Sequence, residues 1–232
     1  MQAMRACKQL VGNSRAARLA CGLAAFFMAA PQGAGAVGLE AIQHCGAEAD
    51  CLGQLEAHAL RDSAGAAKRE GAQLTLQFGL QPAARFVDQP PLVHTYLGRL
   101  DGILLHVVRA ATPTQLPAYW LVGESGQPPL RVEALPSAGP GGRHFVIASG
   151  NTLALYQRSG PRWSLQYRFE APPGLSWAVK SWRDDAAAVR LEWVWPEAPS
   201  ACAGQPAQGG LQLRDGPFGW DLVPPAPHPC SP

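Results

Sequence analysis

The sequence lacks the local motifs that identify common classes of enzyme. It has no Gly-x-Ser-x-Gly elbow, no His-Glu-x-x-His zinc motif, no Walker loop and no dinucleotide-binding glycine fingerprint. A catalytic site gathered from distant loops would leave no such signature, so enzymatic activity stays uncertain. The absence nevertheless favours a non-catalytic protein, and no cofactor is predicted.

No hydrophobic run is long enough to cross a membrane. The apolar run at residues 19–30 is a dozen residues long, whereas a membrane-spanning helix needs about 20. Four basic residues precede this run, and small residues ending in Ala34-Gly35-Ala36 follow it, which is the order typical of a secretory signal. We therefore predict that residues 1–36 are a signal peptide cleaved after Ala36, and that the mature chain of a bacterial protein is periplasmic or secreted.

Charged residues are few, at 16% of the chain, and they form no basic stripe. The net charge of +2 comes from the leader, because residues 37–232 hold 15 basic and 17 acidic side chains. A slightly acidic protein lacks the positive surface that nucleic-acid binding requires. The sequence therefore predicts no nucleic-acid partner and, after cleavage, no membrane span.

Cysteine is also scarce, since only four of the six cysteines follow the predicted cleavage site. An even number in an exported protein favours disulfide bonds. The four lie in pairs near the two ends, which favours Cys45–Cys51 and Cys202–Cys230. The pairings that would join the N-terminal segment to the tail stay open.

Helical periodicity is confined to residues 38–70, where apolar residues recur at helical intervals among charged ones. One continuous helix would hold Cys45 and Cys51 about 9 Å apart, beyond the reach of a disulfide. Two short helices broken near Gly46 are therefore predicted. We expect a helical N-terminal segment, residues 37–71, ahead of a β domain, residues 72–196.

From residue 72 onward, apolar and polar residues alternate, which predicts half-buried strands at 74–78, 163–169 and 189–195. Residues 103–108 and 145–148 are apolar on both faces and are expected to be central. Turn residues recur about every ten positions. The sequence therefore predicts a mainly β fold, an antiparallel meander of about a dozen short strands that forms a sandwich, an irregular barrel or a small propeller-like sheet.

Residues 136–149 combine a turn rich in proline and glycine with an apolar strand. This segment resembles the turn and first strand of propeller blades in the WD40 and TolB-like families, with Gly141 at the position of the families' aspartate. The resemblance covers this segment alone and implies a propeller-like sheet, in which residues 92–134 and 143–183 could each supply four strands. It implies no function, because proteins with such folds have many different functions.

Proline recurs throughout the chain from residue 196 onward, a segment that contains two strand candidates at 210–214 and 218–223. Such a segment has little core of its own. We predict a C-terminal hairpin and tail, residues 197–232, closed by Cys202–Cys230.

His94 and His106 lie on consecutive predicted strands on either side of Asp101. A three-residue loop centred on Leu100 would place the two histidines opposite each other, whereas a two-residue turn would separate them. Opposite placement could provide two ligands for zinc or copper, with a third from elsewhere. The simpler interpretation is two partly buried histidines with hydrogen-bonded rings.

The chain has seven tryptophans, which could provide exposed platforms for a ligand. Trp177 and Trp182 are five residues apart and cannot both face inward on a regular strand. Trp182 is therefore expected to be exposed beside Arg183. Trp182, Trp177 and Arg183 are the predicted binding residues.

Together these features favour an exported, non-catalytic β domain that binds a protein, glycan or envelope component. The alternative is an exported hydrolase or metal-dependent enzyme with a loop-built site near His94 and His106.

Overall fold

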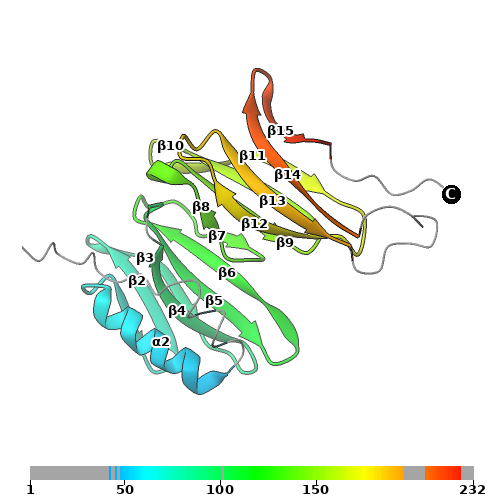
Figure 1. The fold of residues 1–232 in the computed structure, drawn as a ribbon. Coiled ribbons are helices and arrows are strands. Elements are labelled where there is room, and N and C mark those ends of the chain that lie inside the picture. The colour runs from blue at the N-terminus through cyan, green and yellow to red at the C-terminus, as the bar shows by residue number, and fades with distance from the viewer. Residues whose placement is uncertain (1–41, 43–44, 46–47, 101, 196–206, 226–232) are drawn as a thin grey trace, which may run out of the picture. The chain divides into compact units, whose positions relative to one another are not determined.

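The structure is a computed structural model that describes residues 42, 45, 48–100, 102–195 and 207–225, all within the unit Gly33–Pro232 (Figure 1). The predicted signal peptide, its cleavage site and the predicted Cys202–Cys230 bond lie outside the described residues. No helix in the described ranges is both long and apolar enough to span a membrane.

The described strands form four antiparallel sheets, each built from strands that follow one another in sequence. The first sheet contains β1 (Ala67–Glu70), β2 (Gln73–Phe78) and β3 (Gln81–Val87). The second contains β4 (Val93–Leu100), β5 (Leu105–Thr112), β6 (Gln115–Gly123) and β7 (Leu130–Val132). The third contains β8 (Ser137–Ala138), β9 (His144–Ser149), β10 (Thr152–Ser159) and β11 (Arg162–Glu170). The fourth contains β12 (Ser176–Trp182), β13 (Ala188–Val194), β14 (Gln208–Gly216) and β15 (Gly219–Val223).

This arrangement confirms a mainly β fold that is preceded by a helix and built from antiparallel meanders. The described strands divide into separate sheets, and none of these sheets closes into a barrel. The predicted four strands of residues 92–134 correspond to the second sheet. Residues 143–183 were predicted to supply the next four strands, but the third sheet spans residues 137–170 and residues 176–182 begin the fourth. The difference arises because the first strand of the third sheet, β8, has only two residues and lies in a turn-rich segment, where the sequence pattern does not reveal it.

Consecutive sheets share apolar cores, because alternate residues of one strand point to opposite faces. In the third sheet, Phe145 and Ile147 face the second sheet, whereas Val146 faces the fourth. The second sheet is likewise buried on both faces, with Val107 packed toward the third sheet and Val108 toward the first. The prediction of strands buried on both faces is therefore confirmed for residues 105–108 and 145–148, whereas Leu104 lies in the turn before β5 and is exposed. Burial of each such side chain contributes about 1.5–3 kcal/mol.

A bulge in β11 interrupts the alternation predicted for residues 163–169. Leu165 pairs with Tyr156 and Tyr167 pairs with Leu155, so Gln166 has no place in the ladder. Trp163 consequently packs in the core between the second and third sheets, while Tyr167 packs between the third and fourth. The expectation that these residues share one face was wrong, because a bulge moves every later side chain to the other face.

The helix α2 (Ala49–Asp62) follows a break in the chain that the cysteine spacing predicted. Ile42 and Cys45 are helical, whereas Glu48 has an extended backbone. Cys45 and Cys51 form a disulfide, with their Cα atoms 5.4 Å apart. This bond confirms the favoured N-terminal pairing, and Gly46 itself lies outside the described residues.

The helical segment ends earlier than the sequence pattern indicated. Helix α2 stops at Asp62, and residues 67–70 form strand β1, which pairs with β2. The charged residues at 68–70 resembled a helix face, but their alternate burial follows the first sheet. The predicted boundary at residue 71 was therefore wrong, because the β region begins at residue 67.

The C-terminal hairpin is an integral part of the fourth sheet. Strand β14 pairs with β13 along its length, from Ala188 with Arg214 to Val194 with Gln208. Leu211, Leu213 and Trp220 are buried in the core that this sheet shares with the third. The hairpin therefore does have a core, and the sheet holds it in place.

Candidate functional site

Helix α2 lies along strand β4, which is an edge of the second sheet (Figure 1). An edge strand leaves backbone N–H groups without a partner strand. Here two carboxylates accept those hydrogen bonds: Glu56 Oε1 from the N–H of Tyr96 at 2.8 Å, and Asp88 Oδ1 from the N–H of His94 at 2.7 Å. The helix and the segment after β3 thus cap the edge of β4.

Arg69 joins the two carboxylates into one network. Its guanidinium donates to Glu56 Oε1 at 2.8 Å, to Asp88 Oδ2 at 3.0 Å and to the carbonyl of His94. The three charged side chains are only 14–19% exposed. Because all of them hydrogen bond to the edge of β4 or to one another, the network's first role is to stabilise this edge.

A pocket of about 530 Å³ opens beside this network. We call it the α2 pocket, and its walls include Leu52, Asp88, Val93, His94, Arg109 and Pro113. Arg109 is half-buried and forms no ion pair with any residue that the structure describes. The pocket therefore combines apolar side chains, the charged network of Glu56, Arg69 and Asp88, and a further cation, Arg109, that forms no ion pair with a described carboxylate.

No motif or spacing in the sequence singled out Arg109, Glu56, Arg69 or Asp88. Their charges resembled ordinary solvated positions, and the network joins positions 40 residues apart, as in the Glu56 to Tyr96 bond. Only the packing of α2 against β4 brings them together.

His94 and His106 do not face each other, so of the two placements that the sequence left open, the separated one is found. His94 pairs with Ala110 and His106 pairs with Arg99, because the loop lies between Leu100 and Leu105. A further bulge between Tyr96 and Gly98 shifts the register. A loop centred on Leu100 therefore does not form, and the two imidazoles have separate surroundings.

The ring of His94 takes part in the edge network. Its Nδ1 lies 3.1 Å from Asp88 Oδ1, and the residue is 7% exposed. Neither this ring nor that of His106 hydrogen bonds to a serine, threonine or cysteine side chain of the described chain. The arrangement thus resembles a histidine held by an aspartate, but without an adjacent nucleophile.

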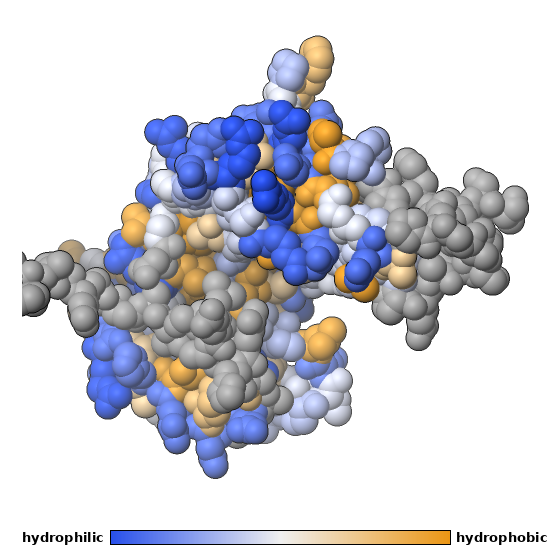
Figure 2. Space-filling model, viewed as in Figure 1, coloured by the Kyte–Doolittle hydropathy of each residue, from blue (hydrophilic) through white to orange (hydrophobic). Residues whose placement is uncertain are grey.

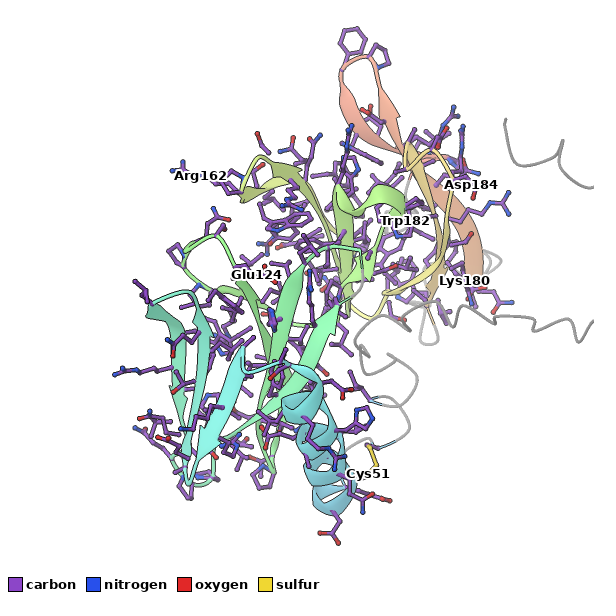
Figure 3. All side chains as sticks on the ribbon, turned by 90° about the vertical axis from the view of Figure 1, so that its left-hand side faces the viewer. Cys51, Glu124, Arg162, Lys180, Trp182 and Asp184 are labelled. Atoms are coloured by element: carbon purple, nitrogen blue, oxygen red, sulfur yellow. A yellow bond between two sulfur atoms is a disulfide. The ribbon has the colours of Figure 1, made fainter. Side chains whose placement is uncertain are left out.

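His106 is buried at 3% exposure, and its Nδ1 lies 2.8 Å from the hydroxyl of Tyr96. Burial lowers the pKa of His106, opposed by the Glu124 carboxylate, and burial raises the pKa of Tyr96 to about 12. A pocket of about 310 Å³ adjoins the ring. Glu124, which follows β6, lies at this pocket and is labelled in Figure 3.

Within the described ranges, no three His, Cys, Asp or Glu side chains come together in a way that could hold a metal ion. Asp88, the carboxylate nearest His94, already hydrogen bonds to Arg69. His94 and His106 therefore do not supply the shared pair of ligands that opposite placement would have given.

Trp177 and Trp182 are not exposed platforms. A bulge in β12 between Val179 and Ser181 absorbs the odd spacing, so Trp177 lies opposite Trp193 and Trp182 opposite Val189. Both tryptophans consequently face the same core. The expectation that one of them would be exposed was wrong for this reason.

Both indoles also hydrogen bond to neighbouring strands and turns. Trp177 is 7% exposed and donates to the carbonyl of Asn151 at 3.0 Å. Trp182 donates to Ser137 Oγ at 3.1 Å, and its ring covers Gly139, where an added Cβ would lie 3.0 Å away. Figure 3 places Trp182 on β12 near the turn that carries Asp184.

Arg183 is exposed and bonds within its own turn. Its guanidinium donates to Asp185, which also accepts from the N–H of Ala187 at 3.0 Å. Trp177 is buried and Trp182 is half-buried against the core, so neither presents a fully exposed ring beside Arg183. The exposed aromatic platform predicted beside Arg183 is therefore not found.

Exposed apolar side chains are dispersed over the described surface. The most exposed are Leu80, Leu116 and Phe218, which lie near three different hairpin turns. Figure 2 shows hydrophilic residues interspersed with separate hydrophobic patches on one face. Pockets, rather than a broad apolar surface, are thus the best candidates for binding.

No protein-family model matches the sequence, and no curated protein shows significant similarity to it.

Proposed function

We propose that the chain is an exported, non-catalytic β domain that binds a protein partner in the periplasm or outside the cell. In this proposal, a carboxylate of the partner enters the α2 pocket and pairs with Arg109. The supporting observation is that Arg109 lacks an ion-pair partner among the described residues while it lines a pocket that also offers apolar side chains such as Leu52 and Val93.

Glu56, Arg69 and Asp88 together carry a charge of −1, and Arg109 carries +1, so the four charges of the pocket balance. Among the described residues, Arg109 is the one cation of the pocket outside that network, and it is the group to which an anionic ligand would bind. Arginine binds carboxylates in a bidentate geometry and is enriched in protein interfaces. Leu52 and Val93 would pack against the apolar part of the ligand.

Among the partners expected from the sequence, a protein is better supported than a glycan. Sugar binding commonly uses exposed aromatic rings, and Trp177 and Trp182 are engaged in the core. The α2 pocket also has no Trp, Tyr or Phe in its walls. An acidic side chain or a C-terminal carboxylate of a peptide fits its composition more closely.

The alternative, a hydrolase or metal-dependent enzyme near His94 and His106, has less support. The two rings lie in separate surroundings, and the His94 ring hydrogen bonds to Asp88 and to no described hydroxyl or thiol. Asp88 and Arg69 are used to cap the edge of β4.

A peptide array tests the proposal. Peptides of random sequence are displayed with a free C-terminal carboxylate or a C-terminal amide, and with internal Asp and Glu either kept or replaced by Asn and Gln. We expect the protein to select carboxylate-bearing peptides. Arg109→Gln should weaken their binding at least about tenfold, because a charged hydrogen bond contributes roughly 1.5–3 kcal/mol.

Arg109→Lys should keep part of the affinity, since it preserves the charge but not the bidentate geometry. Arg131→Gln is the matched control, because Arg131 is exposed on β7 and forms no ion pair within the described chain. Equal binding of carboxylate and amide peptides, or equal effects of the two glutamine variants, would contradict the proposal.

A further inference from the structure

The imidazole of His106 is enclosed by aromatic rings of the first and second sheets. Its centroid lies 4.7 Å from that of Phe78 and 6.0 Å from that of Tyr96. The side chain is 4% exposed, so hydrogen bonds to bulk water are largely excluded. Each ring nitrogen therefore needs a partner from the protein or from a bound molecule.

The contact with Tyr96 determines where the ring carries its proton. Tyr96 is fully buried, and Nδ1 of His106 is the only hydrogen-bond partner of its hydroxyl among the described residues. The hydroxyl must donate to Nδ1, since its own hydrogen would otherwise be unpaired. Neutral His106 thus carries its proton on Nε2.

The Nε2 donor has no hydrogen-bond partner among the described residues. The nearest carboxylate oxygen, Glu124 Oε1, lies 3.5 Å away, and the same oxygen lies 3.7 Å from Nε of Arg99. Both distances are too long for a well-formed hydrogen bond. A buried donor and a carboxylate acceptor therefore lie side by side at the pocket, and neither satisfies the other.

We infer that the pocket beside His106 binds a small neutral ligand with a primary amide or an equivalent planar group. Its oxygen accepts from Nε2 of His106, and its NH₂ donates to Glu124. A primary amide matches this pair because it carries an acceptor and a donor on the same edge.

The charges of the pocket argue against other ligand classes. Its walls carry Asp62, Glu124 and Arg99, so an anion would meet net negative charge. A simple cation has no acceptor for the Nε2 hydrogen of His106. The apolar side chains of Ala59 and Leu104 line the same pocket and could contact the hydrocarbon part of the ligand.

The backbone at the pocket is also unusual. Leu104 adopts φ 56°, a left-handed conformation that is costly for leucine and that tends to occur at functional sites. The inference does not depend on the α2 pocket, because the two pockets share no lining residue.

Nitrogen-15 NMR of the histidine rings in the intact protein tests the inference with isobutyramide as the probe. Isobutyrate and N,N-dimethylisobutyramide serve as the comparison ligands. Isobutyramide should shift the Nε2 resonance of His106 in a saturable manner with millimolar affinity, as expected for a ligand of so few atoms. The anion and the dimethylated amide should bind about tenfold more weakly, because each lacks one of the two interactions.

Variants separate ligand recognition from folding. Glu124→Ala changes a half-exposed side chain and should remove the preference for isobutyramide over its dimethylated form. Glu133→Ala is the matched control, because Glu133 is exposed and lies outside the walls of this pocket, and it should leave the titration unchanged. An unshifted His106 resonance at saturating probe, or equal shifts with all three ligands, would overturn the inference. Unchanged selectivity in Glu124→Ala would overturn it as well.

Discussion

Glu56 offers a sharp test of how the edge of β4 is stabilised. Its carboxylate accepts from the N–H of Tyr96 and from the guanidinium of Arg69, each at 2.8 Å. Glu56→Ala removes both bonds and leaves a buried N–H unpaired beside a guanidinium that has lost one of its two carboxylates. Glu56→Gln keeps an acceptor oxygen for Tyr96 but loses the negative charge.

The magnitudes follow from burial. Removing one partner of a buried ion pair costs roughly 3–5 kcal/mol, and the 14% and 19% exposure of these side chains reduces that figure through solvent screening. An unpaired buried N–H adds about 1–3 kcal/mol, although Asp88 still neutralises Arg69. We expect Glu56→Ala to lower the free energy of unfolding by about 2–4 kcal/mol, and Glu56→Gln by about 1–2 kcal/mol.

Urea unfolding followed by tryptophan fluorescence measures both values, because several of the seven tryptophans are buried in the core. Glu133→Ala is the control: Glu133 is exposed and forms no ion pair with the described residues, so its effect should stay within about 0.5 kcal/mol. A loss in Glu56→Ala no larger than that of the control would refute the role assigned to the network. Equal losses in the alanine and glutamine variants would show that the acceptor oxygen contributes nothing.

Three further predictions concern the disulfide, the buried histidine and the leader. Replacing Cys45 and Cys51 with serine should reduce the free energy of unfolding by about 2 kcal/mol, because the disulfide closes a short loop. The urea midpoint of unfolding measures this loss, and an unchanged midpoint would contradict the prediction. Burial lowers the pKa of His106, so the unfolded chain takes up the proton first as the pH falls below 6.5. The free energy of unfolding should therefore decrease with falling pH, and His106 should contribute at most about 1.4 kcal/mol per pH unit to that decrease. In His106→Gln the decrease should be smaller, and a pH profile of stability identical to that of the native protein would contradict the prediction. Mass spectrometry of the protein exported by a bacterial host should find Val37 at the N-terminus, whereas retention of residues 1–36 would exclude the predicted signal peptide.

The sequence predicted those parts of the fold that depend on local pattern. Alternation located the buried residues Leu74 and Leu76, and the unbroken apolar run at residues 145–148 indicated a strand buried on both faces. The spacing of Cys45 and Cys51 required a break ahead of α2, because geometry forbids the bond across a continuous helix. These inferences need only the periodicity of a single element.

Features that depend on how strands pair escaped prediction. The bulge at Gln166 places Tyr167 in the core between the third and fourth sheets, whereas Trp163 packs between the second and third. The bulge between Val179 and Ser181 turns the side chain of Trp182 toward the core. A bulge inserts one residue without any composition signal in these segments, so the sequence alone could not place it. The expectation that Trp182 is exposed was wrong for this reason.

The candidate pockets were harder to predict from the sequence than the bulges were. His106 was singled out, but its partner Tyr96 and the acceptor Glu124 come from different strands and turns. Glu56 meets the backbone of Tyr96 only because α2 packs along the edge of β4. Side-chain contacts between elements distant in sequence require the packed structure.

NMR of the arginine side chains shows directly whether Arg109 binds a carboxylate of a partner in the α2 pocket. A peptide selected for its carboxylate is titrated into the labelled protein, alongside its amide counterpart. We expect a saturable shift of the Arg109 Nε–H resonance with the carboxylate peptide and little change with the amide. Saturable binding of the carboxylate peptide that leaves Arg109 unshifted would contradict this proposal.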